Sequence, residues 1–157
     1  MIQVALYSVT PVMEPQETRA AFERLTSGTK RVLLVGSCVW FREALAYPIN
    51  RDPGLFVVQQ AGSLEGLRED AVDHDVILTD LDPLLHREPD IVSRLSDCSF
   101  RAPLLALTGS PDLGVLLDAL EGGADMLLSK SASVAEIISS VKLLASTGAT
   151  RTRRGRS

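Results

Sequence analysis

Short apolar runs alternate with helix-like spacings of apolar residues along most of the chain. The runs cover residues 32–35, 55–58, 76–79, 104–107 and 126–128. Their unbroken apolar character is typical of strands that are buried on both faces of a sheet. Because parallel strands need helical crossovers, the alternation predicts an α/β fold with a doubly wound, five-stranded parallel sheet.

Several residues mark where two of the predicted helices begin and end. Ser110 and Pro111 are the expected N-cap and first-turn proline of the fourth helix, and Gly122–Gly123 is expected to end it. Ser133 and Glu136 have the spacing of a capping box. These signals place helices directly after the fourth and fifth strands.

Apolar residues at helical spacing predict which faces of the longer helices pack on the sheet. Two shorter helices are predicted, a polar one over residues 63–70 and a weaker one near residues 89–95. Pro48 is expected to bring the first helix towards its end. The predicted faces are Phe41, Ala44, Leu45 and Pro48 in the first helix, Leu113, Leu116, Leu117 and Leu120 in the fourth, and Val134, Ile137, Ile138 and Val141 in the last.

The alternation divides the chain into three parts. Residues 30–147 are expected to form one domain, and residues 1–29 an N-terminal extension with a short strand and a helix. That helix is expected to pack on the domain; the alternative is that it pairs with a partner. Residues 148–157 are expected to be a basic, disordered tail.

Composition and charge limit the class of protein. The chain has 157 residues, of which 45% are hydrophobic and 23% charged, as in a globular domain. The whole chain carries −4 and its last seven residues carry +4, so residues 1–150 carry −8. Such an acidic body argues against direct nucleic-acid binding by the domain. Without a membrane-spanning run, a signal peptide or a CxxC pair, a cytoplasmic protein with two reduced thiols, Cys38 and Cys98, is expected.

Candidate chemistry lies where the predicted strands end, because ligands of doubly wound sheets gather at the carboxyl ends of the strands. These positions are Gly36–Ser37, Asp80, Thr108 and Lys130. A carboxylate such as Asp80 can act as a nucleophile towards a phosphoryl group. A threonine hydroxyl and a lysine ammonium can then hold the phosphoryl oxygens.

Four motifs in this order resemble a response-regulator receiver domain of the flavodoxin-like or CheY-like (βα)5 type. They are RVLLVGSCVWFREAL, DVILTDLDPL, LLALTGSPD and EGGADMLLSKSAS, and the pattern is closest to receivers that precede a LuxR-type (NarL-type) helix-turn-helix. The resemblance implies that Asp80 stands at the phosphoacceptor position. It also implies that Thr108 and Lys130 belong to the phosphate pocket.

Two departures from the family pattern argue against conventional phosphorylation. In the family an acidic pair at the end of the first strand holds Mg²⁺, and here Gly36 and Ser37 stand at those positions. Mg²⁺ usually needs one or two carboxylates, for which a serine hydroxyl is a poor replacement. The aromatic switch position three residues before Lys130 holds Leu127, which has no polar tip to leave in water.

Asp82 adds a second carboxylate close to Asp80. We expect it to repel phosphate or to face solvent; the alternative is a weak cation site formed by Asp80 and Asp82. Simpler structural roles are also open: Asp80 can be a strand-end carboxylate paired with Lys130, and Thr108 can cap the turn that follows it. Trp40 is expected in the core or half-buried, or else marks a contact surface.

The leading hypothesis is an atypical receiver, or pseudo-receiver, that is not an enzyme, needs no cofactor and acts in signalling or transcriptional regulation through phosphorylation-independent protein–protein contacts. By resemblance, the contact face for a homodimer or a partner is placed on residues 111–146. The alternative is a conventional receiver phosphorylated on Asp80 with Mg²⁺, either by itself or as the regulatory part of a LuxR-type DNA-binding protein. A stand-alone receiver, a shortened form and a fragment of a transcription factor all fit the sequence.

Overall fold

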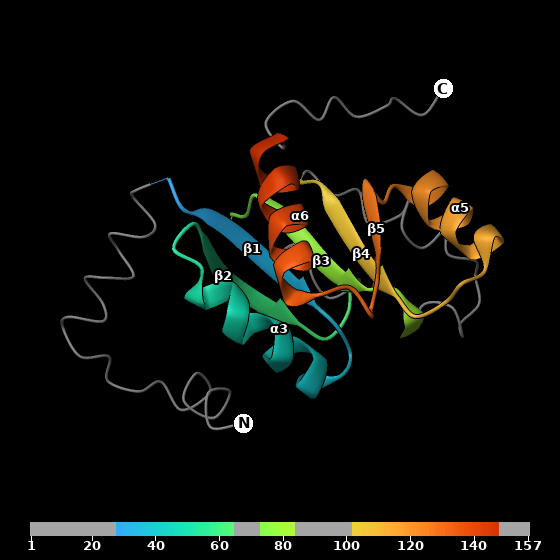
Figure 1. Cartoon of the computed structure of the whole chain (residues 1–157), viewed down its shortest axis with the longest axis horizontal. Helices are drawn as coiled ribbons and strands as arrows, with labels where there is room; N and C mark the ends of the chain where they lie inside the picture. Colours follow the sequence, from blue (N-terminus) through green and yellow to red (C-terminus); the bar gives the residue numbers. More distant parts are fainter. Residues whose placement is uncertain (1–27, 65–72, 84–101, 148–157) are drawn as a thin grey trace.

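The computed structural model describes residues 28–64, 73–83 and 102–147, and within them a five-stranded parallel sheet carries helices on both faces (Figure 1). The strand order is β2-β1-β3-β4-β5, and all four pairings are parallel. The predicted doubly wound sheet is therefore confirmed. In chain order the elements are β1 (Lys30–Val35), α3 (Val39–Arg51), β2 (Leu55–Ala61), β3 (Val76–Asp80), β4 (Leu104–Thr108), α5 (Leu113–Gly122), β5 (Met126–Ser129) and α6 (Val134–Thr147).

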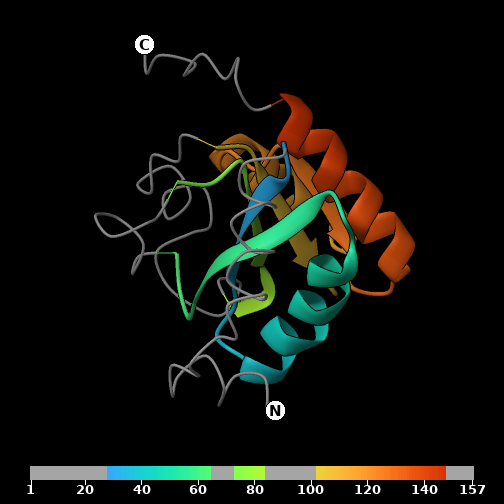
Figure 2. The same cartoon turned by 90° about the vertical axis from the view of Figure 1, so that its left-hand side faces the viewer.

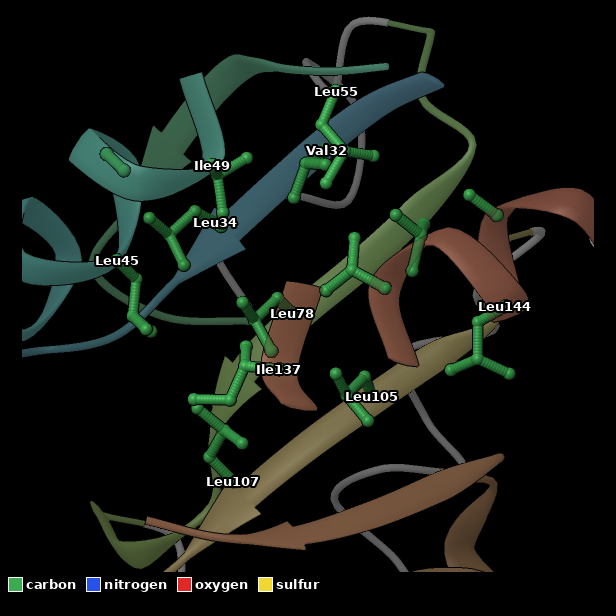
Figure 3. Close-up of a cluster of buried hydrophobic side chains, with 14 residues drawn as sticks. Val32, Leu34, Leu45, Ile49, Leu55, Leu78, Leu105, Leu107, Ile137 and Leu144 are labelled. Atoms are coloured by element: carbon green, nitrogen blue, oxygen red, sulfur yellow. The ribbon is translucent and has the colours of Figure 1, made fainter. Parts of the chain in front are cut away.

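Helices α3 and α6 cover one face of the sheet, as the view along its edge shows (Figure 2). Their buried side chains form one apolar cluster with the residues of β1, β3 and β4 that point to that face (Figure 3). Strands alternate their side chains between faces, so Val32 and Leu34 of β1 belong to this cluster and the residue between them does not. Its largest members include Val32, Leu34, Leu45, Ile49, Leu55, Leu78, Leu105, Leu107, Ile137 and Leu144.

The opposite face of the sheet carries a second apolar cluster. Leu33 and Ile77, which alternate with the residues of the first cluster, are at most 1% exposed there. From α5 the buried contribution is Ala119, a small side chain that lets the helix approach the sheet closely. Clusters on both faces explain why the central strands are almost wholly apolar in sequence.

The predicted apolar face of α5 is wrong. Leu113, Leu117 and Leu120 are 67%, 55% and 46% exposed, whereas Ala119 and Gly122 are buried. Leu116, the fourth residue of the predicted face, is half-buried. The other three leucines thus form an exposed row on α5 rather than the face that packs on the sheet.

The start of α5 also differs from the prediction. Asp112, not Ser110, is the N-cap, and its carboxylate accepts hydrogen bonds from the amides of Gly114 and Val115. An aspartate is as good an N-cap as a serine, so the helix begins two residues later than the serine signal suggested. The predicted end is confirmed, since Gly123 is the C-cap with φ of 120°.

The other two helices agree with the sequence more closely. The capping box is confirmed, because the Ser133 amide donates to the Glu136 carboxylate and the Glu136 amide donates to the Ser133 hydroxyl. In α3 the helix continues through Pro48 to Arg51. Within the predicted faces, Ala44 and Val134 are exposed; the buried residues are Leu45, Ala46 and Ile49 in α3 and Ile137, Val141, Leu144 and Ala145 in α6.

Several predictions lie outside the described residues. These are the strand and helix of the extension up to residue 27, most of the helix over 63–70, the helix near 89–95 and the tail at 148–157. Among the described helices, none is long and apolar enough to cross a bilayer.

Candidate functional site

The register of the sheet brings three strand ends together at its carboxyl edge. Asp80 ends β3 opposite Leu107, the residue before Thr108. Thr108 in turn lies opposite Ser129, and the Lys130 amide donates to the Thr108 carbonyl at 2.9 Å. The predicted set of Asp80, Thr108 and Lys130 therefore meets at adjacent strand ends.

Asp80 is the most buried charged group of this site. Its side chain is 6% exposed, and its Oδ1 lies 2.7 Å from the Lys130 ammonium nitrogen. The same oxygen accepts the Asp82 amide at 3.1 Å. The structural role that the sequence left open, a strand-end carboxylate paired with Lys130, is present in the structure.

Asp82 does not face solvent, contrary to one of the roles expected for it. Its side chain is 28% exposed and turns onto the end of β4. The Thr108 hydroxyl donates to Asp82 Oδ1 at 2.6 Å, and the Gly109 amide donates to both carboxylate oxygens at 3.1 Å. The Lys130 ammonium lies 2.8 Å from Asp82 Oδ2. One carboxylate thus receives a hydroxyl, an amide and an ammonium.

These contacts set the charge states of the site. Burial disfavours the charged form of Asp82, but the hydrogen bonds from Lys130, Thr108 and Gly109 outweigh it and leave the pKa of this carboxyl below its ordinary value. For Lys130, burial lowers the pKa, and the hydrogen bonds to Asp80 and Asp82 more than reverse this, so the net pKa is raised. Two carboxylates and one ammonium leave the site with one unit of excess negative charge.

Gly36, at one of the two acidic-pair positions, lies against an aromatic ring. A Cβ added to Gly36 would lie 2.8 Å from Cδ1 of Phe41, closer than such atoms normally approach. The centroid of the same ring is 5.3 Å from the Lys130 ammonium, within the range of a cation–π contact. Phe41 therefore takes space that a side chain at position 36 would need, while Ser37 is exposed.

The remaining sequence candidates lie around this centre. An Arg42 guanidinium nitrogen donates to the Gly36 carbonyl, which ties α3 to the end of β1. Leu127 is partly buried and packs against the second apolar cluster. Trp40 is 69% exposed, so it is neither a core residue nor half-buried, and Cys38 is exposed at the N-cap of α3.

The carboxylates of the site do not form a metal-binding arrangement. Within the described ranges, no group of three or more His, Cys, Asp or Glu side chains is placed to hold a metal ion. The facing oxygens of Asp80 and Asp82 are both taken by the ammonium of Lys130, at 2.7 and 2.8 Å. Mg²⁺ prefers oxygen ligands in octahedral geometry, so the residues as arranged here do not fit that ion.

Three contributions to the site could not be read from the sequence: the Phe41 ring, the Gly109 amide and the contact between Asp82 and Thr108. The proximity of Asp82 to Asp80 in sequence was visible, but its direction depends on the turn after β3. The Phe41 contact depends on the absence of a side chain at Gly36, whose only sequence signal is the glycine itself.

Comparison with known proteins places this geometry in context. The chain is 30% identical over 115 residues to the transcriptional regulatory protein CutR of Streptomyces coelicolor, an alignment that covers 73% of the chain and 52% of CutR. The chain thus spans about half the length of the curated relatives that it matches. No protein-family model matches the chain.

Two solved structures of response regulators have a similar fold. A LuxR-family two-component response regulator from Aurantimonas sp. SI85-9A1 superposes with a TM-score of 0.63 at 25% identity, covering 76% of this chain and 86% of that one. The signal receiver domain of the response regulator NarL from Mycobacterium tuberculosis superposes with a TM-score of 0.61 at 22% identity, covering 75% and 97%. At the latter identity the likeness concerns the fold alone.

Proposed function

We propose that the chain, which is similar in sequence to a bacterial transcriptional regulator and in structure to response-regulator receivers, is a receiver whose output is protein–protein contact without phosphorylation of Asp80. It takes part in signal transduction as a binding module and has no enzymatic turnover of its own. The observation that carries this proposal is that Lys130 and Thr108, the two groups able to hold phosphoryl oxygens, are both bound to Asp82.

Electrostatics support the proposal. An incoming phosphoryl group is itself anionic and would meet a site with one unit of excess negative charge. To be held, it would have to displace hydrogen bonds to charged groups, each of which contributes about 1.5–3 kcal/mol. A divalent cation would offset that repulsion, but the two carboxylates that remain are already paired with Lys130.

The second candidate is a conventional receiver, favoured by the position of Asp80. Its carboxylate would attack the phosphorus of a phosphohistidine, forming an O–P bond while the N–P bond breaks and the imidazole leaves. The 2.7 Å contact between Lys130 and Asp80 is compatible with that role. Against it stand the 6% exposure of the Asp80 side chain and the carboxylate of Asp82 at the phosphate-binding groups.

We place the contact face on residues 111–146, and the exposed row on α5 supports this. Leu113, Leu117 and Leu120 are between 46% and 67% exposed and recur at helical spacing along α5. On α6, Leu143 is 58% exposed. Exposed leucines gathered on one helix are typical of surfaces that bind another protein. The occupant in this proposal is a second copy of the chain or a signalling partner.

A role in transcription is a further part of the proposal and rests on the relatives. CutR is a transcriptional regulatory protein, and the chain corresponds to about half of it. The net charge of −8 on residues 1–150 supports regulation through protein contacts, with no nucleic acid bound by the domain itself. A cytoplasmic location is consistent with this role.

The test compares phosphorylation with self-association. Wild-type protein and Asp80→Asn are incubated with Mg²⁺ and a small acyl phosphate donor, and each is followed by intact mass and sedimentation velocity. We expect no acid-labile phosphoryl adduct and the same sedimentation for both proteins. An adduct on the wild type that is absent from Asp80→Asn and changes sedimentation would overturn the proposal in favour of the second candidate.

A pair of surface variants tests the contact face separately. Leu117→Glu places a charge in the exposed row on α5, and Val39→Glu makes the same kind of change at a 44% exposed position on α3. We expect weakened self-association or partner binding for Leu117→Glu and none for Val39→Glu. Equal effects of the two variants would contradict the assignment of the face.

A further inference from the structure

Resting on the function proposed above, we infer that Asp82 is an intramolecular ligand of the phosphate-binding groups, a tethered carboxylate in the place of a phosphoryl group. Three donors from two strand ends converge on it: the Thr108 hydroxyl at 2.6 Å, the Gly109 amide at 3.1 Å and the Lys130 ammonium at 2.8 Å. The pocket is thus in an anion-bound arrangement in the unmodified protein.

The donor set is that of an oxyanion site. A hydroxyl, a backbone amide and an ammonium that point at one anion give charge-assisted hydrogen bonds, the strongest kind available to a carboxylate or a phosphate. Thr108 is 3% exposed, so its hydroxyl is nearly sealed from water and needs an internal partner. Asp82 supplies that partner in place of an external anion.

Further hydrogen bonds orient both the Thr108 hydroxyl and the backbone of Asp82. The Thr108 hydroxyl oxygen accepts the Ser110 amide at 3.0 Å, which directs the hydroxyl hydrogen to Asp82. The Asp82 amide donates to Asp80 Oδ1 at 3.1 Å, which fixes the backbone from which the carboxylate projects. Both the donor hydroxyl and the backbone that carries the Asp82 carboxylate are therefore fixed in position.

Tethering makes the carboxylate a strong competitor. A group joined to its site by a short linker acts at an effective concentration of millimolar or more. Free phosphate, or a phosphoryl group on Asp80, would have to displace it and would also add charge to an anionic site. The class of ligand excluded by Asp82, and admitted when its carboxylate is removed, is a tetrahedral oxyanion such as inorganic phosphate.

The test is a titration of the full chain with inorganic phosphate, without metal, followed by the ¹⁵N–¹H signals of Gly109 and Lys130. We expect no saturable shift in the wild type up to ~10 mM phosphate, the scale set by the tether. Asp82→Ala is expected to give a saturable shift with an affinity at least about tenfold higher. Adding Lys130→Ala to that variant is expected to abolish it.

Two controls keep the result interpretable. Asp118→Ala removes the same charge from an exposed position on α5 and is expected to behave as the wild type. Asp82→Asn keeps the shape of the side chain without its charge, and a smaller gain in affinity is expected from it; it also gives the answer if Asp82→Ala does not fold.

The outcomes separate this inference from the proposed function. If the folded Asp82 variants bind phosphate no better than Asp118→Ala, the tethered-ligand role is wrong, while the absence of an Asp80 adduct would still support the proposed function. If the wild type binds phosphate as well as Asp82→Ala, the inference is also wrong, whatever the phosphodonor experiment gives.

Discussion

The two edges of the sheet use aspartates in opposite ways. At the amino edge, Asp75 and Asp125 each lie directly before a strand and accept the backbone amide of a neighbouring strand, that of Arg31 and that of Leu104, both at 2.7 Å. Each also donates its own amide back to the carbonyl of the same residue, at 2.9 and 2.8 Å. These aspartates satisfy sheet ends that would otherwise lack partners.

At the carboxyl edge, two aspartates share one cation. Asp80 and Asp82 both contact Lys130, so one ammonium is shared between two carboxylates. Asp82 also accepts hydrogen bonds from the end of β4. At the amino edge, by contrast, the Arg31 guanidinium contacts Asp75 at 3.2 Å in addition to the backbone bonds. The aspartates of the amino edge stabilise the sheet itself, whereas those of the carboxyl edge concentrate charge where ligands of this fold bind.

The largest expected effect comes from removing the shared cation. Lys130→Met leaves two carboxylates close together without compensation, and we expect the free energy of unfolding at pH 7 to fall by about 2 kcal/mol. This lies below the range for fully buried pairs because Lys130 is 33% exposed. Urea unfolding measures it. Lys142→Met, which removes the partner of the single carboxylate Asp52, is the control and is expected to cost less than about 1 kcal/mol.

The amino edge is tested by Asp75→Ala. The substitution leaves the Arg31 amide without its carboxylate acceptor and removes the guanidinium contact, so a loss of about 1.5 kcal/mol is expected. Asp125→Ala, which removes the same backbone contact to Leu104, is the companion variant. If both were neutral in thermal or urea unfolding, the proposed structural role of the amino-edge aspartates would fail.

A smaller effect is expected from a methyl group at Gly36. In Gly36→Ala the new Cβ would lie 2.8 Å from the Phe41 ring, and moving that ring away from Lys130 is expected to cost about 1 kcal/mol. Gly62→Ala is the matched control, since a Cβ there meets nothing within 4 Å. Equal stability of the two variants would show that the position of the Phe41 ring does not depend on the absence of a side chain at residue 36.

The smallest expected effect is on the pH dependence of stability. The pKa of Asp82 is lowered in the folded state, so its contribution is present above the unfolded pKa of about 4 and is lost as the pH falls through the folded value. Asp82→Asn should therefore flatten the acid limb of a stability–pH curve by a few tenths of a kcal/mol up to about 1. An unchanged acid limb would mean that Asp82 is not stabilised by its contacts.

The order of strands and helices was predictable because it depends on local pattern. Continuous apolar runs located all five strands, and the resemblance in the strand-end motifs placed Asp80, Thr108 and Lys130 at one edge of the sheet. The capping box at Ser133 and the glycine end of α5 were equally local signals, and the structure confirms both.

What the sequence could not give depends on tertiary contacts. A leucine row at helical spacing is the same in sequence whether it faces a sheet or solvent, so Leu113 and Leu117 were assigned to the wrong side. The direction of Asp82 is set by donors 26 and 27 residues further along the chain, at Thr108 and Gly109. From the sequence alone, Asp82 was expected to repel phosphate or to face solvent, and its contacts with Thr108 and Lys130 show that it does not face solvent.

The central claim is that the Asp82 carboxylate already occupies the site formed by Thr108, Gly109 and Lys130. It is tested most directly by fluorine NMR of the protein with Mg²⁺ and beryllofluoride, a phosphoryl mimic. The expected result is no bound signal for the wild type at millimolar ligand and a bound signal for Asp82→Ala. A bound signal of the wild type that disappears in Asp80→Ala would contradict the claim and restore Asp80 as a working phosphoacceptor.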